Sequence, residues 1–188
     1  MTAAIRRPVT EISNPLSGER ITISGAEADD PVLAWELSLA PGGRVPASHT
    51  HPRQQEQFTV LEGRVRFRVG WRRLIAGPGD TVKVTPGTVH HFANAGPGTA
   101  RMAVRTTPAL RMRALLETAA ALAQAQYAGG RALPNVVEVA LFMRDFEAEV
   151  AAPVAPRLVR LVTRALAALG ERGAGGARYR RLRRHTVA

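Results

Sequence analysis

Three histidines and one glutamate have the residue types and the spacing of a metal site: His49, His51, Glu56 and His90. Divalent transition metals accept neutral imidazole nitrogens together with a carboxylate oxygen. On a strand, His49 and His51 would lie on the same face, because side chains alternate with period two. Glu56 follows beyond Pro52, which provides a break where the chain can turn back. We therefore expect the site to assemble only in the folded chain.

These four residues lie within two longer motifs. The motifs read Gly43-x5-His49-x-His51-x4-Glu56-x6-Gly63 and Gly79-Asp80-x4-Thr85-Pro86-Gly87-x2-His90-x3-Asn94. Both resemble the paired motifs of the cupin superfamily, and the first fits at every fixed position. In the second, Thr85 stands where the family usually has proline, and Pro86 follows at once. This departure affects a turn and no ligand.

The resemblance covers residues 14–107. It implies a small single-domain bacterial cupin with a type-2 conserved barrel, an RmlC-like jelly roll of the double-stranded β-helix kind. It also implies that His49, His51, Glu56 and His90 hold one divalent transition metal. The sequence does not determine whether this metal is Fe, Mn, Ni, Zn or Cu. The alternative is a barrel that has kept the motif without binding metal. His91 points to the opposite face of its strand and is expected at the surface rather than as a fifth ligand.

Composition restricts the class of protein further. The chain has 188 residues, which suits one large domain or one domain with an appendage. The absence of cysteine excludes disulfides and thiolate metal ligands. The N-terminus lacks the apolar core of a signal peptide, and no uncharged apolar run is long enough to span a membrane. We expect a cytoplasmic protein.

The formal charge is +11, and Lys83 is the only lysine among 26 basic residues. Arginine bias with abundant alanine and glycine is typical of a GC-rich bacterial genome, which weakens any argument from arginine to nucleic acid. A basic cluster ends the chain: Arg178, Arg180, Arg181, Arg183, Arg184 and His185. Such a run at a chain end is usually a solvated tail, so residues 170–188 are expected to be flexible. Binding of nucleic acid or a membrane surface by this cluster is the less favoured alternative.

Residues 1–13 are expected to be a loose N-terminus, and residues 14–107 a β-barrel. Short segments in the barrel region alternate apolar and polar residues between turn signals, which is typical of sandwiches and barrels. These segments are Ile21–Ile23, Leu33–Leu39, Glu56–Val60, Val65–Val69, Trp71–Ala76, Val82–Val84, Thr88–Phe92 and Met102–Thr106.

Residues 108–169 have a different, helical pattern. Three segments carry apolar residues at helix-like spacing: Leu110–Tyr127, Val136–Ala151 and Leu158–Leu169. Asn135 is a candidate cap for the second segment. The complete expectation is a mainly β fold with an α appendage of about three helices.

The apolar stripes of these helices must be covered. We favour plain cover on the outer face of the barrel, because apolar stripes usually belong to a core. The alternative is a lid over the metal pocket, with Phe142, Met143 or Phe146 touching the substrate. The excess of apolar helix surface also predicts a homodimer.

A small barrel surrounds its site with inward-facing side chains, which here form a mostly apolar pocket. Phe58 and Phe92 are the strongest candidates, because each lies two residues from a ligand on the same face. The full set of expected pocket residues is Trp35, Phe58, Phe67, Phe92, Met102 and Val104.

Three histidines and a glutamate leave coordination positions open for substrate, water or dioxygen. Fe, Ni or Cu would suit a dioxygenase acting on an enol, catechol or flavonoid, as in cupin dioxygenases. Zn or Mn would equally suit an isomerase or decarboxylase. Glu56 is the candidate catalytic proton acceptor. Glu36 and Glu62 are expected at the surface, and no second acid or base is identifiable.

Two classes of function therefore stay open. The favoured one is a metal-dependent, oxygenase-type enzyme acting on a small organic substrate. The other is a non-catalytic cupin that binds a small ligand or metal. A DNA-binding regulator is less favoured, because the helical region lacks compact helix-turn-helix spacing.

Overall fold

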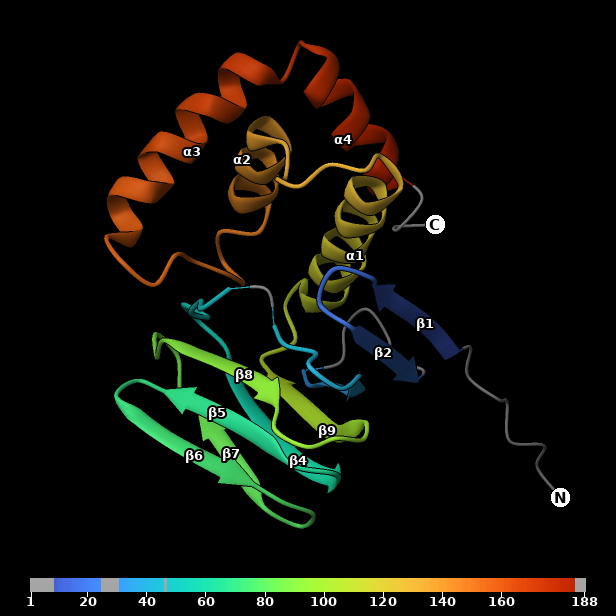
Figure 1. Cartoon of the computed structure of the whole chain (residues 1–188). Coiled ribbons are helices and arrows are strands. Elements are labelled where there is room, and N and C mark those ends of the chain that lie inside the picture. Colours follow the sequence, from blue (N-terminus) through green and yellow to red (C-terminus); the bar gives the residue numbers. More distant parts are fainter. Residues whose placement is uncertain (1–8, 25–30, 46, 185–188) are drawn as a thin grey trace, which may run out of the picture.

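The computed structural model describes residues 9–24, 31–45 and 47–184, which form nine strands and then four helices (Figure 1). The strands are β1 (Val9–Asn14), β2 (Glu19–Ser24), β3 (Leu33–Leu39), β4 (Gln55–Glu62), β5 (Val65–Val69), β6 (Arg72–Ala76), β7 (Thr81–Val84), β8 (His90–Asn94) and β9 (Ala100–Thr107). The helices are α1 (Met112–Ala128), α2 (Val136–Asp145), α3 (Pro156–Gly170) and α4 (Ala174–Arg184). This order confirms the mainly β fold class with C-terminal helices.

The strands form two antiparallel sheets. One has the order β1-β2-β3-β9-β4-β7, and the other has the order β6-β5-β8. The inward faces of both sheets are apolar and share one core. Phe58 of β4 meets Phe67 of β5 and Phe92 of β8, with ring centroids 5.6 Å and 5.2 Å apart. The alternation of apolar and polar residues along the strands therefore places the apolar core between the two sheets.

The four helices gather at one side of the barrel (Figure 1). Helix α1 contacts β1, and α2 contacts α1, α3 and α4. Asn135 caps α2 as expected, since its side chain accepts hydrogen bonds from the N–H groups of Val137 (2.9 Å) and Glu138 (3.2 Å). No described helix is both long enough and apolar enough to cross a membrane.

The basic C-terminus differs from the flexible tail that the sequence predicts. Residues 174–184 form α4, and Tyr179 is only 2% exposed. Asp145 at the end of α2 accepts a hydrogen bond from the Tyr179 hydroxyl (3.2 Å) and pairs with Arg183. Arg178 lies 3.4 Å from the buried Glu138. Acidic partners distant in sequence thus order the basic segment, while residues 185–188 lie outside the described part of the chain.

Two other segments depart from expectation. Val9–Asn14 pairs with β2 instead of being loose, and residues 1–8 lie outside the described part. Helix α2 ends at Asp145, before the expected Ala151. The chain leaves the helix here because Ala151 joins the barrel, exchanging two backbone hydrogen bonds with Thr50 (3.1 Å and 2.9 Å).

Gly63, which closes the first motif, should not tolerate a side chain. Its φ is +74°, and an added Cβ would lie 2.9 Å from both the Cα of Ala100 and the carbonyl oxygen of Thr99. We expect Gly63→Ala to lower the free energy of unfolding by about 3 kcal/mol, from strain and clash together.

Gly70→Ala is the matched control in denaturant unfolding. Gly70 has φ +57° with nothing within 4 Å of an added Cβ, so only strain of about 1 kcal/mol is expected. Equal losses in the two variants would show that the close approach to Ala100 is unimportant.

Candidate metal centre

The structure brings the four expected ligand residues together where the two sheets meet. Glu56 lies in β4, His90 begins β8, and His49 and His51 lie in the segment before β4. The backbones of His49 and His90 exchange two hydrogen bonds, at 3.2 Å and 3.0 Å. This pairing joins the His49–His51 segment to the three-stranded sheet.

The three histidines form one compact cluster. One ring nitrogen from each lies within 4.8 Å of the others. Ring centroids are 4.9 Å apart for His49 and His51, 4.4 Å for His49 and His90, and 5.2 Å for His51 and His90. Three convergent imidazoles at this spacing could hold a metal ion.

The Nδ1 atom of each ring is next to a backbone carbonyl oxygen. The pairs are His49 with Ala47 (3.0 Å), His51 with Glu149 (2.5 Å) and His90 with Thr88 (3.1 Å). A carbonyl oxygen can only accept, so in the neutral form of each ring Nδ1 carries the proton and Nε2 keeps its lone pair. The Nε2 atoms of His51 and His90 are buried without a hydrogen bond. Such carbonyl bonds orient imidazoles for metal binding.

Glu56 lies beside two of these unsatisfied nitrogens. Its side chain is buried, and Oε2 lies 3.2 Å from the Nε2 atoms of both His51 and His90. The Thr106 hydroxyl donates to Oε1 (3.4 Å). Trp35 donates its Nε1–H to that hydroxyl (3.2 Å), so a short hydrogen-bond chain on β3 and β9 orients the carboxylate.

The pKa values of Glu56 and His51 reflect this contact. Burial by itself would raise the pKa of Glu56, but His51 and His90 outweigh it and hold that pKa well below its ordinary value. Burial would likewise lower the pKa of His51, yet the Glu56 carboxylate raises it. The site therefore favours a positive charge beside an ionised Glu56. Three imidazoles and one carboxylate are a donor set that suits a divalent transition metal in that place.

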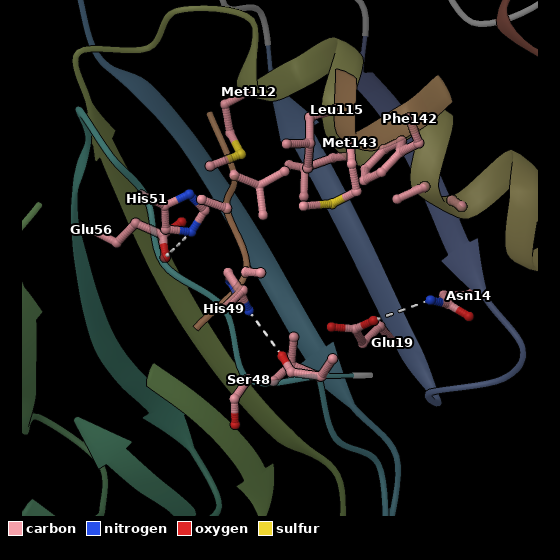
Figure 2. A pocket seen from close by; sticks show the side chains of 18 of the residues that line it. Asn14, Glu19, Ser48, His49, His51, Glu56, Met112, Leu115, Phe142 and Met143 are labelled. Atoms are coloured by element: carbon pink, nitrogen blue, oxygen red, sulfur yellow. Dashed lines mark hydrogen bonds and ion pairs between the residues drawn. The ribbon is translucent and has the colours of Figure 1, made fainter. Parts of the chain in front are cut away.

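A cavity of about 480 Å³ opens from this cluster, between the barrel and the helices (Figure 2). Of the expected pocket residues, Trp35, Phe58 and Phe92 line it. Phe67, Met102 and Val104 are buried in the barrel core and do not line this cavity. All six side chains point inward, but three face the cavity and three lie deeper in the barrel core. The alternation of a strand predicts which side chains point inward, not how deep they lie.

Helices form the remaining wall of the cavity. Figure 2 shows Met112 and Leu115 of α1, and Phe142 and Met143 of α2, facing the histidine cluster across it. Val159 of α3 also contributes. The sequence favoured cover on the barrel's outer face, whereas these helices cover the mouth of the pocket. The sequence could not distinguish these two roles, because a helix that lines a pocket has the same spacing of apolar residues as a helix that packs on a core.

Two acidic residues of the site, Glu149 and Glu19, were not predicted from the sequence. Glu149 is buried and provides the carbonyl that holds His51, while its carboxylate accepts the N–H of Arg111 (3.2 Å). Glu19 lines the cavity from β2. Its position on the same face as Ile21 and Ile23 was the available signal. Glu36 and Glu62 pair with Arg101 at the surface, as expected.

Comparison with known proteins agrees with this geometry. Residues 35–105 match the family model described as a cupin domain. The barrel of this chain is therefore a cupin domain, which confirms the resemblance seen in the two motifs. The matched range ends before α1 begins, so the helices that complete the cavity lie outside it. No curated protein matches the chain.

Solved structures are similar to this chain over 54–57% of its length. Streptomyces Pac13, described as a unique nucleoside dehydratase and solved with uridine, is 18% identical, with 56% of this chain and 83% of that chain covered and a TM-score of 0.46. An RmlC-like cupin from Shewanella frigidimarina is 19% identical, covering 57% and 89%, with a TM-score of 0.45. A predicted oxalate decarboxylase from Thermotoga maritima is 19% identical, covering 54% and 93%, with a TM-score of 0.46.

In metal-free protein, His49 should stay neutral to acidic pH. Burial, together with the charges of His90 and His51, lowers the pKa of His49 to about 4 from 6.5. Between pH 6.5 and about 4, His49 binds more protons in the unfolded state than in the folded state. Its contribution to the free energy of unfolding therefore falls as the pH drops through this range. NMR titration of the imidazole should place its midpoint near the lower value. The urea-unfolded protein is the control, and a folded midpoint equal to the unfolded one would contradict the prediction.

Proposed function

We propose that this protein is a metal-dependent enzyme of the oxygenase type. One divalent transition metal binds at His49, His51, Glu56 and His90, and a small organic substrate, enolic or aromatic, occupies the adjoining cavity. The clustering of three imidazoles, two of which lie 3.2 Å from the buried Glu56 carboxylate, at one end of an apolar cavity carries this proposal.

The identity of the bound metal would decide which reaction this donor set supports. Fe, Ni or Cu in such a site supplies dioxygen activation, whereas Zn or Mn supplies Lewis-acid catalysis for isomerisation or decarboxylation. Glu56 is ionised and faces the cluster, so it is the proton acceptor that we propose, although its lowered pKa makes it a weaker base than an ordinary carboxylate. Thr106 keeps one carboxylate oxygen oriented while the other serves the site.

The apolar wall determines which substrates can enter. Phe58 and Phe92 place two aromatic rings beside the cluster, and Phe142 and Met143 close the opposite side. These side chains exclude water and favour a planar or aliphatic substrate body. Methionine also adapts to irregular shapes, which suits a wall that contacts substrate.

The first test is metal content with turnover. We expect about one divalent metal ion per chain in purified protein, and oxygen uptake with a panel of enols and catechols. The His49→Ala/His90→Ala double variant should lose the metal and all turnover, because two of four ligands are removed. Elemental analysis and an oxygen electrode measure the two effects.

His91→Ala is the matched control, since His91 adjoins His90 but lies outside the histidine cluster. It should keep metal and turnover, while circular dichroism should show the same fold in all variants. Full metal content in the double variant would refute the ligand assignment. A protein that holds one metal ion per chain and binds ligands, but shows no turnover with any metal, would instead be a non-catalytic binding protein.

The expected homodimer is a further proposal, supported by one face of α3. Leu158, Leu161 and Leu169 of this helix are 61%, 67% and 83% exposed, and an apolar stripe of this kind favours association. Light scattering at micromolar concentration should give twice the chain mass. Leu161→Glu/Leu169→Glu should give a monomer, while Leu133→Glu, outside α3, should not. A monomeric wild-type protein would contradict the proposal.

A further inference from the structure

Ionisable side chains occupy two separate places in the cavity wall. The metal-centre residues His49, His51 and Glu56 form one place, and Glu19 of β2 forms the other. Figure 2 shows Glu19 across the cavity from His51 and Glu56. In the six-stranded sheet, β3 and β9 separate β2 from β4. Three strand spacings correspond to about 14 Å measured along the sheet, so the two places are too far apart to act on one functional group.

Glu19 lies on the inward face of its strand. The alternation of β2 places it beside Ile21 and Ile23, both of which are buried. No described residue forms an ion pair with its carboxylate. Burial raises the pKa of Glu19, although hydrogen bonds from Ser17 and Asn14 oppose the shift. An inward carboxylate without a cation is costly and needs hydrogen-bond partners.

Only one of its two oxygens has such partners among the described residues. The Ser17 hydroxyl donates to Oε2 at 2.5 Å, and the Asn14 side-chain amide donates to the same atom at 3.3 Å. Oε1 receives no hydrogen bond from the described residues. Glu19 and Asn14 both line the cavity, so Oε1 is available to a molecule inside it.

The rest of the cavity wall is mostly apolar. Ile12, Ile21, Leu116 and Ala120 contribute to it, and Trp35 of β3 offers its ring because its N–H is already bonded to Thr106. A ligand that fills the cavity must therefore be apolar in the middle. It can be polar where it meets the metal centre and where it meets Glu19.

We propose that Glu19 is a second anchor of the substrate site, binding a hydroxyl or amine at the far end of an elongated, otherwise apolar ligand. This inference rests on the proposed function, because it assumes that the other end of the ligand binds the metal through an oxygen atom. Glu19 selects the substrate and takes no part in the chemistry. A hydrogen bond to an ionised carboxylate, or to a neutral acid, discriminates strongly against a methyl group at the same position.

A purely structural role for Glu19 predicts something different. Asn14 ends β1 and Ser17 lies in the turn between β1 and β2, so the carboxylate also ties this hairpin together. If that were its whole role, replacing it would affect stability and not ligand preference. Ser17→Ala separates the two roles, because Ser17 bonds Glu19 but does not line the cavity.

The test uses protein loaded with Zn(II), which is redox-silent, and three series of probes matched in chain length: fatty acids, ω-hydroxy fatty acids and ω-amino fatty acids. Isothermal titration gives Kd for each probe. At the best-fitting length, we expect wild type to bind the hydroxy or amino probe about tenfold tighter than the methyl-terminated one. Glu19→Gln should reduce the amino preference most, because it removes the charge, and Glu19→Leu should reverse both preferences.

Ser17→Ala should keep the preference of wild type. The proposal is overturned if wild type does not distinguish the terminal groups at any chain length, if Glu19→Gln and Glu19→Leu keep the wild-type preference, or if Ser17→Ala loses it equally. Failure of the proposed metal site would instead appear as loss of zinc in elemental analysis. The terminal-group comparison can then be made on metal-free protein, so the two failures are distinguishable.

Discussion

The hydrogen bond from His51 Nδ1 to the carbonyl of Glu149 is the contact on which the site most depends. It fixes the tautomer of a buried imidazole, and its acceptor comes from the chain that follows α2 rather than from the barrel. The adjacent pairing of Thr50 with Ala151 strengthens the same junction. The helical region and the metal centre are therefore coupled. A movement of this segment would change the orientation of a ligand as well as the access to the cavity.

Ion pairs as well as apolar packing hold α4 against α2. Arg178 and Arg183 of α4 reach Glu138 and Asp145 of α2, across a buried cluster that includes Tyr179. A buried carboxylate is stable only when it is paired, and these arginines provide the pairing. The basic end of the chain thus stabilises the wall of the cavity, and part of the large positive charge has a structural use.

The cavity has the character expected of a site that binds and orients a small molecule. Its walls are apolar, and its carboxylates stand at separate places with different surroundings. Glu56 lies among imidazoles that keep it ionised, whereas Glu19 has neutral donors, Ser17 and Asn14, among the described residues and a raised pKa. Two carboxylates in one cavity can therefore differ in protonation and in role, because local partners rather than residue type determine the pKa.

The sequence by itself determined the barrel and the residues that meet in the candidate metal centre. Period-two alternation specifies which face of a strand is buried, and the spacing of His49, His51, Glu56 and His90 has chemical meaning before folding. Asn135 likewise predicted the start of a helix, because capping is a local interaction. Tertiary structure alone decided what lies opposite the metal centre. A stripe on α1 or α2 shows the same pattern whether it meets a core or a cavity, so the role of Phe142 could not be read from it. Glu149 and Arg183 act through partners far away in the chain, and no local pattern encodes such pairs.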